Sequence, residues 1–165
     1  MRKIVIHRPG SYSRLTLQDA PALEAPLDGV VVAVEAIGVN YADCMVRMGL
    51  YQSAKDFVGW PITPGFEVTG RVAAVGAEVQ DLAVGDPVLA VTLFNGYATE
   101  VAVRRPYVFP LPPDVDPVAM AGFPAVFLTA YFALFELAHP RPGAKILIHS
   151  AAGGVGSALV QLARV

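Results

Sequence analysis

The last part of the sequence contains the pattern that most constrains the fold. A short apolar run, Lys145–His149, follows the turn residues Pro142 and Gly143 and leads directly into the glycine-rich segment Ser150–Gly156. Apolar residues at helical spacing follow over 157–165. A strand, a glycine loop and a helix in this order open a dinucleotide-binding α/β domain. The sequence therefore predicts the first βα unit of such a domain.

The glycine loop is a variant of the GxGxxG motif, with Ala151 in the first place. Gly153 would let the backbone approach a diphosphate, and Gly156 would let the helix pack closely on the strand. The start of that helix offers N–H groups and the positive end of a dipole to phosphate. The alternative is a glycine-rich turn without a ligand. The predicted coenzyme-binding residues of the loop are Ala152, Gly153, Gly154, Val155 and Gly156.

One βα unit cannot bury both of its faces alone. We therefore expect the chain to be part of a longer molecule, or its tail to pack on something else. We also expect exposed apolar surface at Ile146–Ile148 and along Leu159–Leu162, and weak NADPH binding by these 165 residues alone. The residue that separates NAD from NADP lies about 20 residues beyond the glycine loop, hence past Val165.

Short β-branched runs between glycine and proline punctuation occupy the chain up to about Pro113. Such runs favour a small β-barrel or sandwich over βα units. The predicted strands are Val30–Val34, Glu67–Val75, Pro87–Val91 and Gly96–Val103.

Composition excludes several classes of function. The 165 residues are 55% hydrophobic and carry a net charge of −2, so there is no basic excess for a nucleic-acid backbone. The single cysteine, Cys44, excludes an internal disulfide framework and a multi-cysteine metal site. It is compatible with a reducing compartment.

The 18 residues from Val118 to Phe135 carry no charge, which is close to the length of a membrane span. Gly122 and Pro124 interrupt them, and Asp116 before a proline is typical of a helix start. The pattern therefore predicts two helices between Pro117 and about Ala138, with a break at Pro124, and no membrane span.

Several ordered motifs carry a family resemblance. They are residues 38–43 (GVNYAD), 47–51 (RMGLY), 61–72 (PITPGFEVTGRV), 84–88 (VGDPV) and 134–156, which ends in the glycine loop. At this spacing they resemble the medium-chain dehydrogenase/reductase superfamily in its zinc-free quinone oxidoreductase branch. The nearest group is the synaptic-vesicle-type quinone oxidoreductase-like proteins, and the resemblance spans the whole chain.

The resemblance implies a fold and its division. Residues 1–124 would form a mainly β GroES-like barrel, the catalytic domain, without the chain segment that returns to it in the family. Residues 125–165 would hold helices and the first βα unit of a truncated Rossmann domain.

The resemblance also implies a site without metal. Zinc-dependent relatives place Cys, His and Cys where this chain has Asn40, Phe66 and Ala125. An amide, a phenyl ring and a methyl group cannot supply the nitrogen and sulfur donors that zinc prefers. No metal site is therefore expected. The histidines are isolated from one another in the sequence, at His7, His139 and His149.

The implied catalytic residues are Asn40, Tyr41 and Tyr51, which would project toward the nicotinamide and donate hydrogen bonds to the substrate oxygen. Either Tyr51 or a water would supply the proton, or else Tyr51 only forms the cleft wall. Asn40 and Thr129 would also contact the coenzyme. The alternative for Thr129 is a helix hydroxyl bonded to the preceding turn.

Three neighbouring residues have structural interpretations. Asp43 is expected to pair with backbone or with Arg47, Glu67 to anchor a local hydrogen-bond network, and Cys44 to pack as a small apolar residue.

The implied function is an NADPH-dependent oxidoreductase, with NADH not excluded, that transfers hydride to a quinone or an α,β-unsaturated carbonyl without zinc. The complete protein would be a cytoplasmic homodimer acting on a small molecule, not on nucleic acid, and this chain alone would be inactive. Two alternatives stay open: a non-catalytic binding or structural protein that retains the reductase scaffold, and an enoyl reductase module of a larger synthase.

Overall fold

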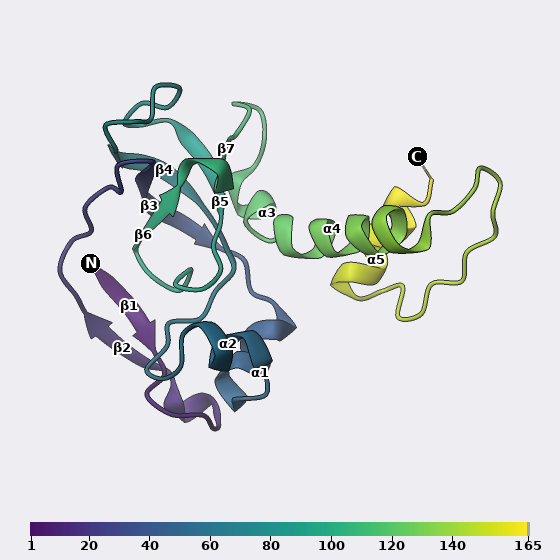
Figure 1. The fold of residues 1–165 in the computed structure, drawn as a ribbon, viewed down its shortest axis with the longest axis horizontal. Coiled ribbons are helices and arrows are strands. Elements are labelled where there is room, and N and C mark those ends of the chain that lie inside the picture. The colour runs from purple at the N-terminus through teal and green to yellow at the C-terminus, as the bar shows by residue number, and fades with distance from the viewer. Residues whose placement is uncertain (165) are drawn as a thin grey trace. The chain divides into compact units, whose positions relative to one another are not determined.

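The computed structural model describes residues 1–164. They form two compact units, Met1–Gly122 and a second that begins at Phe123. The first unit is built on a β-sheet and the second on helices (Figure 1).

The first unit contains a five-stranded antiparallel sheet in the order β6-β3-β4-β5-β7. Three of its strands cover runs predicted from the sequence, and β6 covers only the second half of the predicted run Gly96–Val103. Their bounds are Gly29–Ile37 (β3), Glu67–Val75 (β4), Pro87–Val91 (β5), Glu100–Arg104 (β6) and Val108–Pro110 (β7). The fifth, β7, was not predicted, because three residues are too few to show a period.

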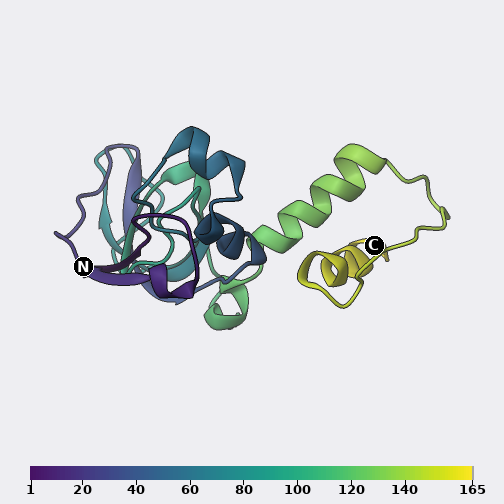
Figure 2. The same ribbon diagram turned by 90° about the horizontal axis from the view of Figure 1, so that it is seen from below.

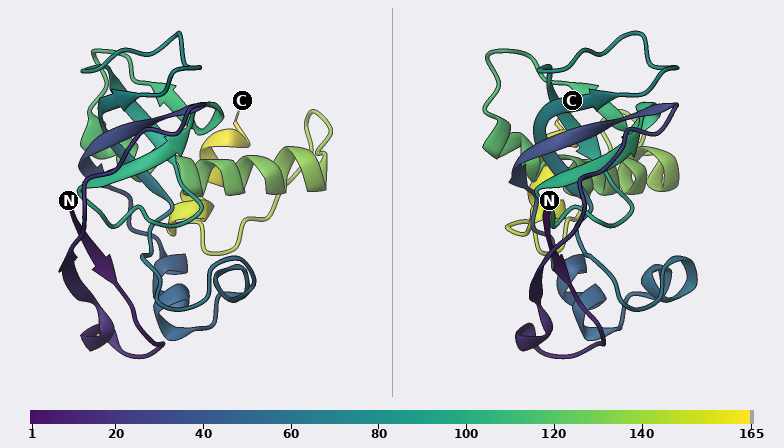
Figure 3. Two further views of the ribbon diagram at one scale, coloured as in Figure 1. Left: turned by 60° about the vertical axis from the view of Figure 1, so that its left-hand side comes forward. Right: turned by 90° about the vertical axis from the view of Figure 1, so that its left-hand side faces the viewer.

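Valines from the sheet form the main core of this unit. Val30, Val68 and Val88 lie on three neighbouring strands and are fully buried. The pairing of β3 with β4 shifts register between Val31 and Val32, and again between Val34 and Ala36. Such irregularities bend a strand and increase its twist. The sheet is accordingly curled rather than flat (Figure 3).

A two-stranded hairpin, β1 (Arg2–Val5) and β2 (Thr16–Asp19), lies outside that sheet. One 3₁₀ turn, η1 (Tyr12–Arg14), precedes β2. This hairpin was not predicted, because β2 is four residues long and largely exposed. Ile6 follows β1 directly and belongs to a second apolar cluster.

That second cluster fixes the short helices α1 (Tyr41–Met48) and α2 (Gln52–Phe57). Its buried members are Ile6, Val46, Ala54, Ile62 and Phe94. Ile6 and Ile62 also form a backbone bridge. The helices are therefore held between Ile6, from the start of the chain, and Phe94, from much later in it.

A 3₁₀ turn, η2 (Arg105–Tyr107), links β6 to β7, and the short helix α3 (Pro117–Ala121) ends the first unit. The Asp116 side chain accepts the Val118 N–H at the start of α3. Thr69 Oγ1 in β4 donates to the Pro117 carbonyl at 2.8 Å, which fastens this helix to the sheet.

In the second unit, α4 (Pro124–Tyr131) continues without interruption into the π-helical segment η3 (Phe132–Ala138) (Figure 2). The predicted pair of helices with a break at Pro124 is confirmed. Helix α5 (Gly154–Leu162) follows the glycine loop, three residues earlier than expected. Within residues 1–164, no helix combines the length and the hydropathy needed to span a bilayer.

The prediction of a strand at Lys145–His149 is wrong, because the structure has no strand there. A strand exists only through hydrogen bonds to a neighbour, and no segment of residues 1–164 pairs with this one. Ile146 and Leu147 are exposed, at 43% and 81%, whereas Ile148 is half-buried. The pattern of an apolar strand is present, but its partner is not among the described residues.

Candidate functional site

Two of the sequence motifs, 38–43 and 61–72, meet in the first unit. Asn40 stands immediately before α1, and Glu67 is the first residue of β4. The Asn40 Nδ2 donates to Glu67 Oε1 at 2.6 Å, and the Gly38 N–H donates to the Glu67 carbonyl at 3.1 Å. Glu67 is completely buried. It therefore anchors the local network that the sequence analysis expected of it.

Gly38 makes this meeting possible. A Cβ at this position would lie 2.4 Å from Glu67 Oε1 and 2.2 Å from the Ala121 carbonyl oxygen. Both distances are far shorter than a van der Waals contact, so only glycine fits between the carboxyl group and the end of α3.

A second buried carboxyl group, Asp43, fixes the backbone around Asn40. It accepts hydrogen bonds from the Asn40 N–H at 2.8 Å, the Gly65 N–H at 3.1 Å and the Tyr97 hydroxyl at 3.1 Å. Burial raises the pKa of Asp43 above its ordinary value, and these three donors oppose that rise. Burial and the neighbouring Asp43 charge likewise raise the pKa of Tyr97.

Of the two partners expected for Asp43, the structure shows the backbone. The Arg47 guanidinium donates instead to the Gly10 carbonyl. Cys44 is half-buried. Tyr97 is the network member that the sequence analysis missed. It lies 54 residues from Asp43 in an apparent strand run, so no local signal could have identified it.

The two predicted catalytic tyrosines have different surroundings. Tyr51 precedes α2, and its ring contacts Phe66 at 5.6 Å and Phe94 at 6.4 Å between centroids. Tyr41 is 77% exposed. Phe66, at the position matched to a zinc-binding histidine in relatives, therefore belongs to an aromatic cluster. Glu67, the next residue, holds Asn40.

Among residues 1–164, no group of three or more His, Cys, Asp or Glu side chains gathers where it could hold a metal ion.

The glycine loop of the second unit has the geometry expected of a close helix–loop contact. A Cβ at Gly156 would lie 2.1 Å from the Ser150 carbonyl oxygen, whereas one at Gly153 would lie 3.3 Å from the same atom. Ser150 has φ of 53°, and its carbonyl accepts the Gly153 N–H at 2.9 Å. No side chain caps the start of α5. The first backbone N–H groups of this nine-residue helix therefore have no side-chain cap, and the residues around them are small. This arrangement suits the binding of a diphosphate.

Thr129 forms the hydrogen bond of the structural alternative. Its Oγ1 donates to the Ala125 carbonyl at 2.6 Å, one turn earlier in α4. The side chain is exposed. A contact between Thr129 and a coenzyme stays a prediction.

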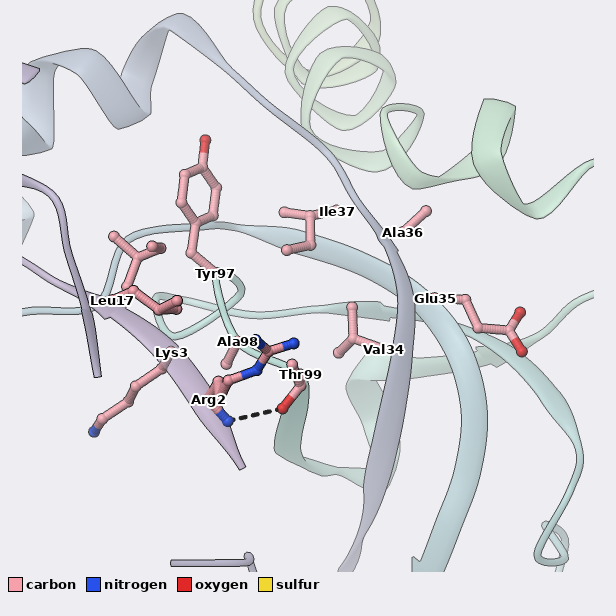
Figure 4. A pocket seen from close by; sticks show the side chains of 11 residues that line it. Arg2, Lys3, Leu17, Val34, Glu35, Ala36, Ile37, Tyr97, Ala98 and Thr99 are labelled. Atoms are coloured by element: carbon pink, nitrogen blue, oxygen red, sulfur yellow. Dashed lines mark hydrogen bonds between the residues drawn. The ribbon is translucent and has the colours of Figure 1, made fainter. Parts of the chain in front are cut away.

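A pocket of about 440 Å³ lies between the β1–β2 hairpin and β3 (Figure 4). Leu17, Val34 and Ile37 supply apolar lining, and the Arg2 N–H donates to Thr99 Oγ1 at 2.9 Å beside it. None of the predicted catalytic or coenzyme-binding residues lines this pocket. Tyr97 lines the pocket and also donates to Asp43, so the pocket borders the network around Asn40.

Comparison with known proteins places the chain in a family. Residues 27–122 match the alcohol dehydrogenase GroES-like domain. The mouse (Mus musculus) synaptic vesicle membrane protein VAT-1 homolog-like is 39% identical over 163 residues, which cover 98% of this chain and 38% of that protein.

Two solved structures are also similar. The CurK enoyl reductase superposes with a TM-score of 0.92 at 32% identity, covering 99% of this chain and 51% of that one. The Escherichia coli quinone oxidoreductase complexed with NADPH superposes with a TM-score of 0.88 at 26% identity, covering 99% and 49%. The chain thus spans about half, or less, of these relatives. It belongs to the alcohol dehydrogenase GroES-like family, in the branch of the medium-chain dehydrogenase/reductase superfamily that contains the quinone oxidoreductases and VAT-1 homologues.

Proposed function

We propose that the complete protein carrying this sequence is an NADPH-dependent oxidoreductase that reduces a quinone or an α,β-unsaturated carbonyl without zinc. The observation that carries the proposal is the close contact of Gly156 with the Ser150 carbonyl, because a dinucleotide-binding loop needs a glycine where the helix packs closely. One of the chain's structural neighbours is a quinone oxidoreductase complexed with NADPH. The similarity to an enoyl reductase supports the second substrate class.

NADPH, when bound, supplies the hydride. The residues proposed to hold its diphosphate are the backbone N–H groups of the loop from Ala152 to Gly156, where small side chains leave room for close approach. Thr129 and Asn40 are the further proposed contacts, from α4 and from the start of α1.

Without a Lewis acid, hydrogen-bond donors must polarise the substrate oxygen. The Asn40 amide nitrogen gives one N–H to Glu67 and carries a second, which is the donor proposed here. Tyr51 supplies a phenol whose ring is held by Phe66 and Phe94. A phenol hydroxyl can donate a hydrogen bond or a proton to a substrate atom.

The test follows NADPH absorbance during incubation of the complete gene product with a para-quinone, an ortho-quinone and an α,β-unsaturated ketone. A saturated ketone is the control. We expect turnover of at least one of the first three, none of the saturated ketone, and no loss after dialysis against a metal chelator. Absence of turnover across the panel would favour the non-catalytic alternative.

Replacement of Tyr51 by Phe tests proton donation, because the ring packing is kept and only the hydroxyl is lost. If Tyr51 is the donor, kcat falls about 100-fold, the lower range for a general acid. The affinity for NADPH stays unchanged. Tyr12→Phe, at a residue 81% exposed in the N-terminal region, is the matched control. Unchanged turnover in Tyr51→Phe would assign the proton to water.

We further propose that the complete protein is a cytoplasmic homodimer. Light scattering coupled to size-exclusion chromatography tests the dimer, and fractionation of the source cells tests the compartment.

A further inference from the structure

Glu67 and Asp43 are the two buried acidic residues among those the structure describes. Burial of a carboxyl group is costly unless its oxygens accept hydrogen bonds. Both carboxyl groups accept from the same residue, Asn40: Asp43 from its backbone N–H and Glu67 from its side-chain amide. Backbone and side chain of Asn40 are thus fixed independently.

The chemistry of this contact determines which end of the amide turns inward. Glu67 Oε1 accepts the hydrogen bond at 2.6 Å, so the nitrogen of the Asn40 amide faces it. Gly38 provides the space that the Glu67 carboxyl group needs in this position. The inward nitrogen carries a second N–H, so the amide can still donate to one more acceptor.

We propose that Glu67 is a positioning residue that presents Asn40 as a hydrogen-bond donor, so that this site selects a substrate with an acceptor atom such as a carbonyl oxygen. This inference rests on the proposed function, because it assumes that Asn40 contacts the substrate. Glu67 itself contacts no substrate: it acts through Asn40.

A polarity swap in the complete protein separates positioning from simple support of the fold. Asn40→Asp alone places two carboxyl groups face to face and lowers the thermal midpoint. In Asn40→Asp combined with Glu67→Gln, the amide introduced at position 67 donates to the carboxylate introduced at position 40. The hydrogen bond returns with reversed polarity, and the thermal midpoint recovers toward that of the natural sequence.

Activity is expected to behave differently from stability. Side chain 40 cannot donate in either variant, so kcat with the quinone stays about 100-fold low in both, the size expected for one lost donor to a developing oxyanion. Glu67→Gln alone, which can both donate and accept, falls between the natural protein and the swap in kcat. Asn40→Ala gives the reference value for a site without the donor.

The outcomes distinguish this inference from the function on which it rests. Turnover by the natural protein, together with recovery of both stability and kcat in the swap, would show that Glu67 only supports the fold, and would overturn the inference alone. No turnover by the natural protein on the whole substrate panel would overturn the proposed function and the inference together. Recovery of the thermal midpoint without recovery of kcat supports both.

Discussion

The β-sheet of the first unit and residues 145–149 of the second place their apolar side chains in different surroundings. In the unit Met1–Gly122, valines such as Val68 are fully buried between paired strands. In the unit that begins at Phe123, Leu137 is 67% exposed and Leu147 is 81% exposed. Both regions have similarly strong apolar patterns in sequence. The difference teaches that a pattern becomes a strand only where the described chain also supplies its neighbour.

The largest expected effect compares one buried and one exposed apolar residue. Val68→Ala removes two methyl groups from the sheet core and should lower the free energy of unfolding by about 2–3 kcal/mol. Leu147→Ala should change it by less than about 0.5 kcal/mol. Urea unfolding of the 165-residue chain, followed by circular dichroism, measures both. Similar losses would mean that residues 145–149 are packed in solution, which would break the comparison.

A smaller effect is expected at the glycine loop. In Gly156→Ala the added Cβ would lie 2.1 Å from the Ser150 oxygen, so the loop must shift. In the complete protein, affinity for NADPH should fall about tenfold, or about 1.4 kcal/mol. Alanine is the better helix former, so propensity would act in the opposite direction. Calorimetric titration measures the change.

Gly122→Ala is the control for that variant, because nothing lies within 4 Å of the added Cβ. NADPH affinity should be unchanged in it. Equal affinity in Gly156→Ala and the natural protein would show that the loop tolerates a side chain, and would remove the support that this contact gives to coenzyme binding.

The smallest expected effect is the pH dependence at Asp43. Its pKa is raised in the folded protein from 3.8, chiefly by burial, so the folded state binds more protons than the unfolded chain above that pH. The free energy of unfolding contributed by this group therefore falls as pH rises from 3.8 through the folded pKa, and is constant above it. Urea unfolding across that range should show this fall in the natural protein and not in Asp43→Asn.

Tyr97→Phe sharpens the same measurement. The Tyr97 hydroxyl donates to Asp43 and lowers the pKa of that carboxyl group. Loss of the hydroxyl should therefore extend the fall in the free energy of unfolding to higher pH. An identical pH profile in Tyr97→Phe and the natural protein would contradict the role of this hydroxyl.

Local patterns sufficed for much of the fold. Four strands of the main sheet and the helix break at Pro124 follow from β-branched runs and proline positions within a few residues. Two features required knowledge of distant partners. The hairpin β1–β2 is stabilised by contacts with residues near Ala98, and the segment at Ile146 has no partner among residues 1–164.

The candidate site, like the fold, could be predicted only in part from local sequence patterns. The role of Glu67 as an anchor could be inferred from its motif, and the glycine loop from its spacing. The Tyr97–Asp43 hydrogen bond could not, because Tyr97 belongs to none of the motifs and lies 54 residues from Asp43 in the chain. The roles of Asn40 and Tyr51 in catalysis stay predictions, because local geometry shows what holds each side chain and not what it acts upon.

The pairing of β3 has a consequence for synthesis on the ribosome. Its neighbours in the sheet are β4 and β6, and β6 ends only at Arg104. Until that residue has emerged from the exit tunnel, the nascent chain holds valine-rich edges without both neighbours, and Asp43 lacks its last donor for most of that interval. A translational pause before this point would prolong exposure to aggregation, whereas one placed after it would let β3 pair with both of its neighbours first.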